Sequence, residues 1–202
     1  MRPLKAVDKV CVADAIAKGT CPVCNALKEF QSAMLETAKA EGAAHLCNYH
    51  AWALARSAPA DVAGEIFLNV LHRWRQHTTM EGSRCDFCQR IRDEEQSRLA
   101  ELTEQFGNPA IAELMQEHGA ICLAHGRGLA SRLPAPLQPV LARVLSRTAR
   151  NLDEELQAFV KNAQEGQHIG GGILGHVAEF LVSQRGISHE ETPCSNRDQQ
   201  KR

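Results

Sequence analysis

The chain is organised around Cys21-Pro-Val-Cys24 and Cys47-Asn-Tyr-His50, a pair of motifs that returns as Cys85-Asp-Phe-Cys88 and Cys122-Leu-Ala-His125. Each occurrence supplies three thiols and one imidazole, which is a ligand set of tetrahedral zinc sites. Residues three apart project from nearly the same side of a helix, so both ligands of a pair can reach one ion. The eight residues therefore predict two metal sites per chain.

The sequence that follows the CxxH motifs repeats as well. His50 and Leu54 match His125 and Leu129 at an offset of 75 positions. Beyond the prolines that follow, apolar residues again correspond at the same offset: Val62 with Leu137, Ile66 with Leu141, and Val70 with Leu145. This agreement beyond the ligands indicates an internal duplication.

The two copies differ in the distance between their ligand pairs. Cys24 and Cys47 are 23 positions apart, whereas Cys88 and Cys122 are 34 apart, a difference of 11. Eleven residues make about three helical turns, so the insertion can add helical structure without changing which side faces the core. We expect two helical modules, 1–80 and 81–165, each clamped by its own cluster, although exchange of ligands between modules is equally compatible with the spacing.

Start signals and apolar periodicity predict an all-α helical bundle. No convincing alternating strand pattern is present, and aromatic residues make up only 4% of the chain. The expected helices are 7–18, 24–41, 47–57, a helix that starts at Pro59, 85–106, 109–117, 122–132, a long helix that starts at Pro134, and a C-terminal amphipathic helix.

Apolar spacing also predicts which helix faces are buried. In the helix after Pro59, an i+4 stripe should pack inward, formed by Val62, Ile66, Val70 and Trp74. In the long helix the expected inward face comprises Leu137, Val140, Leu141, Val144, Leu145, Leu152, Leu156, Phe159 and Val160.

The C-terminal part has a different composition. A glycine-rich linker and a tethered amphipathic helix occupy 166–187, and the polar segment 188–202 is expected to be disordered. An amphipathic helix on a flexible tether can dock in a partner's groove. We therefore expect a protein partner to bind through the 173–185 helix.

Bulk composition excludes several classes of partner. The 202 residues carry a formal net charge of −1, so no global basic field would attract nucleic acid or an anionic membrane. No apolar run approaches the roughly 20 residues that span a bilayer. We expect a cytoplasmic protein with reduced cysteines, of which only Cys11 and Cys194 lie outside the motifs. The oligomeric state stays open.

Three functions are compatible with these ligands. A site with four protein ligands has no open position for substrate, which favours structural Zn²⁺ in an interaction or regulatory protein without catalytic activity of its own. Iron–sulfur clusters also accept cysteine and histidine ligands and would indicate a redox or electron-transfer protein. A CxxC at a helix N-terminus also resembles the dithiol of an oxidoreductase. Disulfide pairing of the six motif cysteines is the fourth interpretation, and a reducing compartment disfavours it.

Two further histidines precede the CxxH motifs. His45 and His118 could act as alternative ligands or as hydrogen-bond donors to a ligand. They do not align with each other in the repeat. We therefore expect both to be loop histidines.

The organisation resembles an uncharacterised bacterial family of similar length that carries tandem CPxC and CxxH pairs. Cys21-Pro-Val-Cys24, Leu46-Cys47-Asn-Tyr-His50-Ala-Trp52 and Ile121-Cys122-Leu-Ala-His125 carry the likeness, which extends from about Cys21 to Val160. Asp86 departs from the pattern, because proline is usual at that position. The resemblance implies a helical metal-site scaffold and no particular reaction.

Overall fold

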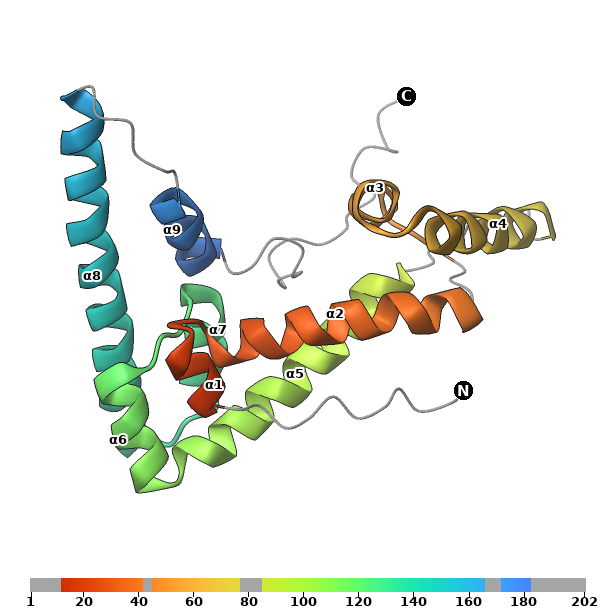
Figure 1. Ribbon diagram of the computed structural model, residues 1–202. Coiled ribbons are helices and arrows are strands. Elements are labelled where there is room, and N and C mark those ends of the chain that lie inside the picture. The colour runs from red at the N-terminus through yellow and green to blue at the C-terminus, as the bar shows by residue number, and fades with distance from the viewer. Residues whose placement is uncertain (1–11, 42–44, 77–84, 166–171, 183–202) are drawn as a thin grey trace, which may run out of the picture. The chain divides into compact units, whose positions relative to one another are not determined.

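A computed structural model describes residues 12–41, 45–76, 85–165 and 172–182, and this part of the chain is helical without strands (Figure 1). The all-α prediction is confirmed. The α-helices are α1 (Val12–Ala17), α2 (Pro22–Glu41), α3 (Asn48–Ser57), α4 (Ala60–Gln76), α5 (Asp86–Phe106), α6 (Pro109–His118), α7 (Leu123–Ala130), α8 (Gln138–Gln164) and α9 (Gly172–Val182). A short 3₁₀ helix, Ala135–Leu137, precedes α8.

Each of the four ligand pairs begins a helix. The helices α2, α3, α5 and α7 start one residue after the first cysteine of a motif. Cys47 and Cys122 have the extended backbone of an N-cap residue, with ψ angles of 164° and 156°. The second ligand of each pair then occupies the third helical position. Side chains at these two positions face each other across the open first turn, as in a capping box.

The inserted segment between the ligand pairs of the second copy forms a helix of its own, α6. Asn108 caps it by accepting a hydrogen bond from the Ala110 N–H at 3.0 Å, and Pro109 occupies the first turn. Asparagine at the N-cap followed by proline is a strong start signal. The predicted helix at 109–117 is confirmed to within one residue.

The described chain forms two compact units that do not follow the expected halves. Unit 1 contains Leu27–Gln96, and unit 2 combines Asp8–Ala26 with Ser97–Arg185. The boundaries fall inside α2 and α5, so each of these helices contributes to both units. The reason is that each CxxC pair meets the CxxH pair of the other sequence half.

The core of unit 1 surrounds the second CxxC motif. Its buried residues are Phe30, Met34, Leu54, Val62, Ile66, Cys85, Phe87, Cys88 and Ile91. The predicted stripe on α4 is correct for Val62 and Ile66, and Val70 packs partly against the core. It is wrong for Trp74, which is 52% exposed near the end of the helix.

In unit 2, the long helix α8 packs against α6, α7 and α9 (Figure 1). Leu141 and Val144 are buried as predicted, whereas Val160 is 45% exposed. Helix α7 approaches α8 closely at Gly126, where an added Cβ would lie 2.9 Å from a methyl carbon of Leu145. Helix α9 has no fully buried residue but lies on α7 and α8.

Several predictions fall on residues outside the described ranges. These include the start of the first helix with Cys11, most of the glycine-rich linker, the end of the 173–185 helix, and the 188–202 tail with Cys194. Among the described helices, none combines the length and apolarity needed to cross a membrane.

Candidate metal centres

All eight predicted ligands gather into two groups. Unit 2 holds Cys21, Cys24, Cys122 and His125, hereafter the unit 2 cluster. Unit 1 holds Cys47, His50, Cys85 and Cys88, the unit 1 cluster. In each cluster the four ligand atoms all lie within 4.8 Å of one another.

The partners of the ligand pairs differ from the expectation that each sequence half carries its own cluster. The CxxC pair at the start of α2 meets the CxxH pair at the start of α7. The CxxH pair at the start of α3 meets the CxxC pair at the start of α5. Each CxxC pair thus completes its cluster with the CxxH pair of the other sequence half, which is the alternative that the spacing had left open. This exchange explains why the compact units are not the two halves of the sequence.

In the unit 2 cluster, the Nδ1 atom of His125 is surrounded by three sulfurs. It lies 3.4 Å from the Sγ atom of Cys21, 3.4 Å from that of Cys24 and 3.2 Å from that of Cys122. The Sγ atoms of Cys24 and Cys122 are 3.7 Å apart. Nδ1 is therefore the histidine nitrogen in position to bind an ion.

The unit 1 cluster has nearly the same geometry. The Nδ1 atom of His50 lies 3.2 Å from the Sγ of Cys47, 3.5 Å from that of Cys85 and 3.3 Å from that of Cys88. The Sγ atoms of Cys47 and Cys88 are 3.7 Å apart. Two clusters on different helices thus have almost the same internal distances.

These separations fit a single tetrahedral ion. Zinc–sulfur bonds of about 2.3 Å and zinc–nitrogen bonds of about 2.0 Å would put two sulfurs about 3.8 Å apart and a sulfur and nitrogen about 3.5 Å apart. The observed distances of 3.7 Å and 3.2–3.5 Å lie close to these edges. The donor set, three thiols and one imidazole, also suits zinc.

Disulfide pairing does not occur among the six described cysteines. The 3.7 Å between the sulfurs of Cys24 and Cys122, and between those of Cys47 and Cys88, is far longer than a disulfide bond of about 2.05 Å. The thiols are instead arranged around a common centre.

Both clusters are enclosed by protein. In unit 2 all four ligands are buried, and His125 is only 1% exposed. In unit 1, His50, Cys85 and Cys88 are buried, while Cys47 is half-buried. The ring of Phe87 covers the His50 imidazole, with centroids 5.6 Å apart. With four protein ligands, such a site leaves no coordination position for substrate.

Hydrogen bonds within the unit 2 cluster shift the pKa values of its thiols in opposite directions. Burial alone would raise the pKa of Cys21, but hydrogen bonds with Cys122 and Cys24, together with His125, outweigh burial and hold that pKa well below its ordinary value. Hydrogen bonds with Cys122 and Cys21 raise the pKa of Cys24. The lowered pKa of Cys21 favours its thiolate, which is the form that binds a metal.

In the unit 1 cluster, the first cysteine of the CxxC motif also has a lowered pKa. Burial would raise the pKa of Cys85, and a hydrogen bond with His50 outweighs it, so that the pKa is lowered. Cys85 and Cys21 occupy equivalent positions, each at the start of a CxxC motif immediately before a helix. The unpaired N–H groups of that first turn add partial positive charge beside the thiolate.

Two hydrogen bonds join the loop before Cys47 to the start of α5 in unit 1. In unit 1 the Asp86 N–H donates to the His45 carbonyl at 3.1 Å, and the His45 N–H donates to the Asp86 carboxylate at 3.3 Å. This reciprocal pair ties the segment before Cys47 to the segment after Cys85. Asp86, which stands where the first CxxC motif has Pro22, therefore joins the two segments that carry the unit 1 ligands.

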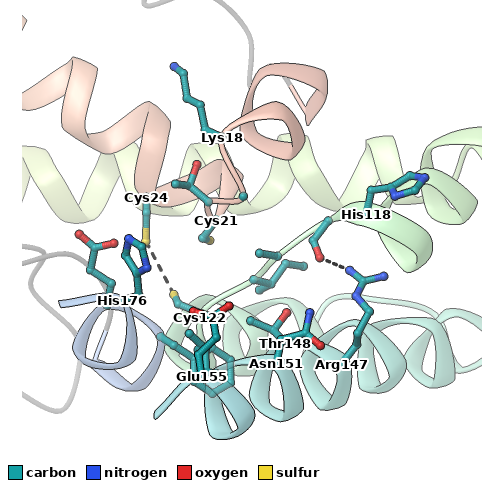
Figure 2. A pocket seen from close by; sticks show the side chains of 18 residues that line it. Lys18, Cys21, Cys24, His118, Cys122, Arg147, Thr148, Asn151, Glu155 and His176 are labelled. Carbon is teal, nitrogen blue, oxygen red and sulfur yellow. Dashed lines mark hydrogen bonds between the residues drawn. The ribbon is translucent and has the colours of Figure 1, made fainter. Parts of the chain in front are cut away.

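In unit 2 the side chain of Arg147 holds the loop that precedes Cys122 (Figure 2). Its guanidinium donates to the backbone carbonyls of Met115, Gln116 and Gly119, at the end of α6 and in the loop that leads to Cys122. Sequence reasoning missed this residue. The only sequence feature that could have indicated it is the position of Arg147, one helical turn after the buried Val144 on the apolar side of α8.

The two additional histidines are not members of the clusters. His45 is half-buried and lies in the loop before Cys47. His118 is exposed at the end of α6, with its Nε2 atom 3.5 Å from the Glu117 carboxylate. Both are loop or helix-end residues.

Comparison with family models, curated proteins and solved structures finds nothing that matches this chain.

Proposed function

We propose that this protein is a metal-stabilised interaction or regulatory protein that holds two structural zinc ions. The observation that carries the proposal is the pair of closed, four-ligand clusters with tetrahedral edge lengths. Cys21, Cys24, Cys122 and His125 would hold one ion, and Cys47, His50, Cys85 and Cys88 the other. Zinc would supply cross-linking between helix N-termini and no catalytic chemistry.

The burial of the ligands supports a structural role. A catalytic zinc keeps a position for water or substrate beside three protein ligands. Here four protein ligands surround each centre, and seven of the eight are buried. A structural zinc of this kind contributes on the order of 10 kcal/mol or more to folding.

Iron–sulfur clusters are the first alternative. A cluster places inorganic sulfide and more than one iron between its protein ligands, so the ligands must spread further than around a single ion. The four ligand atoms of each group are all within 4.8 Å of one another, which favours one ion per site.

A dithiol oxidoreductase is the second alternative. Its attacking thiolate must be accessible to a disulfide substrate. Cys21 and Cys24 are 8% and 3% exposed, and Cys85 and Cys88 are 5% and 3% exposed. This burial argues against thiol exchange. Metal ligation requires thiols that stay reduced, and we propose a cytoplasmic location because that compartment keeps thiols reduced.

A partner-binding surface is the second part of the proposal. Helix α9 leaves Leu174, Leu181 and Val182 more than half exposed while its other side lies on α7 and α8. Apolar side chains on one face of an amphipathic helix suit a groove or a second helix in a partner. We propose that a protein partner binds on this face.

The deciding experiment is elemental analysis, with a visible spectrum, of protein purified without oxygen. We expect about two equivalents of zinc per chain and no absorption in the visible range. Iron with acid-labile sulfide would contradict the zinc proposal and establish the redox alternative. A chain that carries less than a half equivalent of any metal would contradict both.

A further inference from the structure

Helix α4 of unit 1 has apolar side chains on the side opposite the one that enters the core. Val62 and Ile66 are buried, whereas Leu68 and Leu71 are 57% and 55% exposed. The last six residues of the helix, 71–76, are all exposed. Most helices in proteins depend on the packing of an apolar face more than on intrinsic propensity. The exposed side of α4 is therefore expected to pack against another surface.

The exposed side has the residue spacing of a helix pair. Four positions, separated by four, three and four residues, form what we call the α4 row: Gly64, Leu68, Leu71 and Arg75. This heptad spacing keeps one side of a helix facing a partner helix. At one end of the row, an added Cβ on Gly64 would meet no atom of the described residues within 4 Å, so there is room for a side chain. At the other end, Arg75 is a long and exposed side chain.

The charges of α4 are separated along its length. Asp61 and Glu65 lie on either side of Gly64 near the start, whereas Arg73 and Arg75 lie in the last turn. In a parallel pair of α4 helices, Arg75 would face Arg75 of the other copy. In an antiparallel pair, Arg75 of one copy lies beside Asp61 and Glu65 of the other. Charge complementarity therefore favours the antiparallel pair.

We propose that the α4 row binds a second copy of this chain, with the two α4 helices antiparallel. At the centre, Leu68 of each copy packs on Leu71 of the other. At each end, Arg75 of one copy enters the space beside Gly64 of the other and pairs with its Glu65. Every contact occurs twice, as a two-fold symmetric interface requires.

Two aromatic residues on one flank extend this contact. Trp74 is 52% exposed and Phe67 is half-buried, and they stand seven positions apart on the same side of α4. In the antiparallel pair, the Trp74 ring of one copy lies over Phe67 of the other. Tryptophan is among the residues that contribute most to the energy of protein interfaces. The exposure of Trp74 near the end of α4 thus has a role in the dimer.

The size of the contact sets its expected strength. The α4 row is about 16 Å long, because an α-helix rises about 1.5 Å per residue. A contact of this length is smaller than a standard stable interface, which takes about 800 Å² from each partner. The dimer should therefore be weak, with a dissociation constant in the micromolar range.

Sedimentation velocity of the metal-loaded full chain, from micromolar to millimolar concentration, tests the proposal. We expect a reversible monomer–dimer equilibrium, which Leu71→Ser should weaken at least tenfold. Leu181→Ser on α9 is the matched control, because Leu181 is 53% exposed and Leu71 is 55% exposed. A chain that stays monomeric at millimolar concentration would overturn the proposal. So would a dimer that is lost with Leu181→Ser and kept with Leu71→Ser, which would place self-association on α9.

Charge reversal tests the antiparallel direction. Glu65→Arg and Arg75→Glu should each weaken the dimer at least tenfold, because each change brings like charges together at both ends. Mixed in equal amounts, the two variants should form a heterodimer in which both ends again hold opposite charges. Arg73→Glu, on the other side of α4, is the control and should leave dimerisation unchanged. The absence of a heterodimer, or an equal loss with Arg73→Glu, would contradict the antiparallel pair.

An anionic membrane is the other surface that leucine, tryptophan and arginine on one helix suit. The carboxylates of Asp61 and Glu65 beside the α4 row disfavour it, because an anionic surface repels them. Vesicles of phosphatidylglycerol are the probe, and we expect the chain not to sediment with them. A monomeric chain that sediments with these vesicles, and loses this binding with Leu71→Ser, would overturn the dimer proposal.

Metal content separates this inference from the proposed function. Each variant should retain two metal equivalents, which shows that it has folded. A monomeric chain would leave the zinc proposal untouched, and a different metal in the clusters would leave the dimer proposal untouched.

Discussion

At the scale of single residues, the ligand positions combine two roles. Cys47 and Cys122 are N-cap residues with extended backbone, and the second ligand of every pair stands in the first helical turn. Serine is also a good N-cap residue, so Cys→Ser at such a position removes a metal ligand while it keeps a cap. Ligand variants can therefore report on metal binding with little disturbance of the helix start.

Ligand exchange makes a specific prediction about pairs of variants. Cys24→Ser and Cys122→Ser should each reduce the metal content from two equivalents to one. Combined, they should still leave one equivalent, because both residues belong to the unit 2 cluster. Cys24→Ser combined with Cys47→Ser should remove both. Metal analysis after gel filtration measures this, and the reverse pattern would mean that each sequence half keeps its own ions.

A second residue-scale prediction concerns Arg147. Arg147→Ala removes the side-chain donor to the carbonyls of Gln116 and Gly119, and a second donor to the Met115 carbonyl, which also accepts the Gly119 N–H. Unsatisfied buried polar groups cost about 1–3 kcal/mol, and we expect a loss of this size in the free energy of unfolding. Urea denaturation of metal-loaded protein measures it. Arg150→Ala, at an exposed position on the same helix, is the control, and an equal effect there would show that the carbonyl contacts contribute nothing.

At the scale of elements, helix order repeats across the two halves. Helices α2, α3 and α4 correspond in order to α5, α7 and α8, and α6 is the addition. Leu54 and Leu129, matched by the sequence repeat, are both buried, as are Ile66 and Leu141. These agreements support a duplication, which stays a prediction.

Glycines in two of these helices make a matched pair. Gly64 of α4 has open space where a Cβ would be, so Gly64→Ala should stabilise the protein by about 0.5–1 kcal/mol through helix propensity. At Gly126 of α7 the Cβ would lie 2.9 Å from a Leu145 methyl carbon. Overpacking costs about 1–3 kcal/mol, so Gly126→Ala should be net destabilising. Thermal or urea unfolding compares the two, and a gain at both positions would contradict the close packing of α7 on α8.

The sequence predicted the helices well because their signals are local. Each ligand pair begins a helix, and a proline or glycine stands near several of the ends. Burial was harder to predict at helix ends. Trp74 has the right spacing for the α4 stripe but lies beyond the core that Val62 and Ile66 enter. Periodicity shows which side is apolar and cannot show how far along the helix the neighbouring elements extend.

At the scale of the whole molecule, the ligands were predictable and their partners were not. A CxxC pair is chemically the same whichever CxxH pair completes it, so local spacing carries no information about the choice. That choice depends on which helix N-termini meet in space. A cavity of about 340 Å³ beside the unit 2 cluster (Figure 2) was equally inaccessible to sequence reasoning, because the loops before α2 and α7 meet α8 and α9 at its wall.

Removal of both ions should affect the whole described fold. A structural zinc contributes about 10 kcal/mol or more, comparable to the 5–15 kcal/mol that stabilises a typical domain. We expect an excess of chelator to abolish cooperative thermal unfolding and to increase protease sensitivity in both units. Circular dichroism and limited proteolysis measure these changes, with restoration by added zinc as the control. An unchanged melting temperature in the metal-free protein would refute a structural role.

The exchanged ligand pairs also impose an order on biosynthesis. In the sequence the unit 1 ligands, from Cys47 to Cys88, lie nested between the two ligand pairs of unit 2. A nascent chain that has reached only His50 carries two half-sites and no complete shell. The inner site can be filled once Cys88 has left the ribosome, whereas the thiols at Cys21 and Cys24 must wait for His125. The earliest pair to be synthesised is therefore the one that stays exposed to competing metals and oxidants for longest.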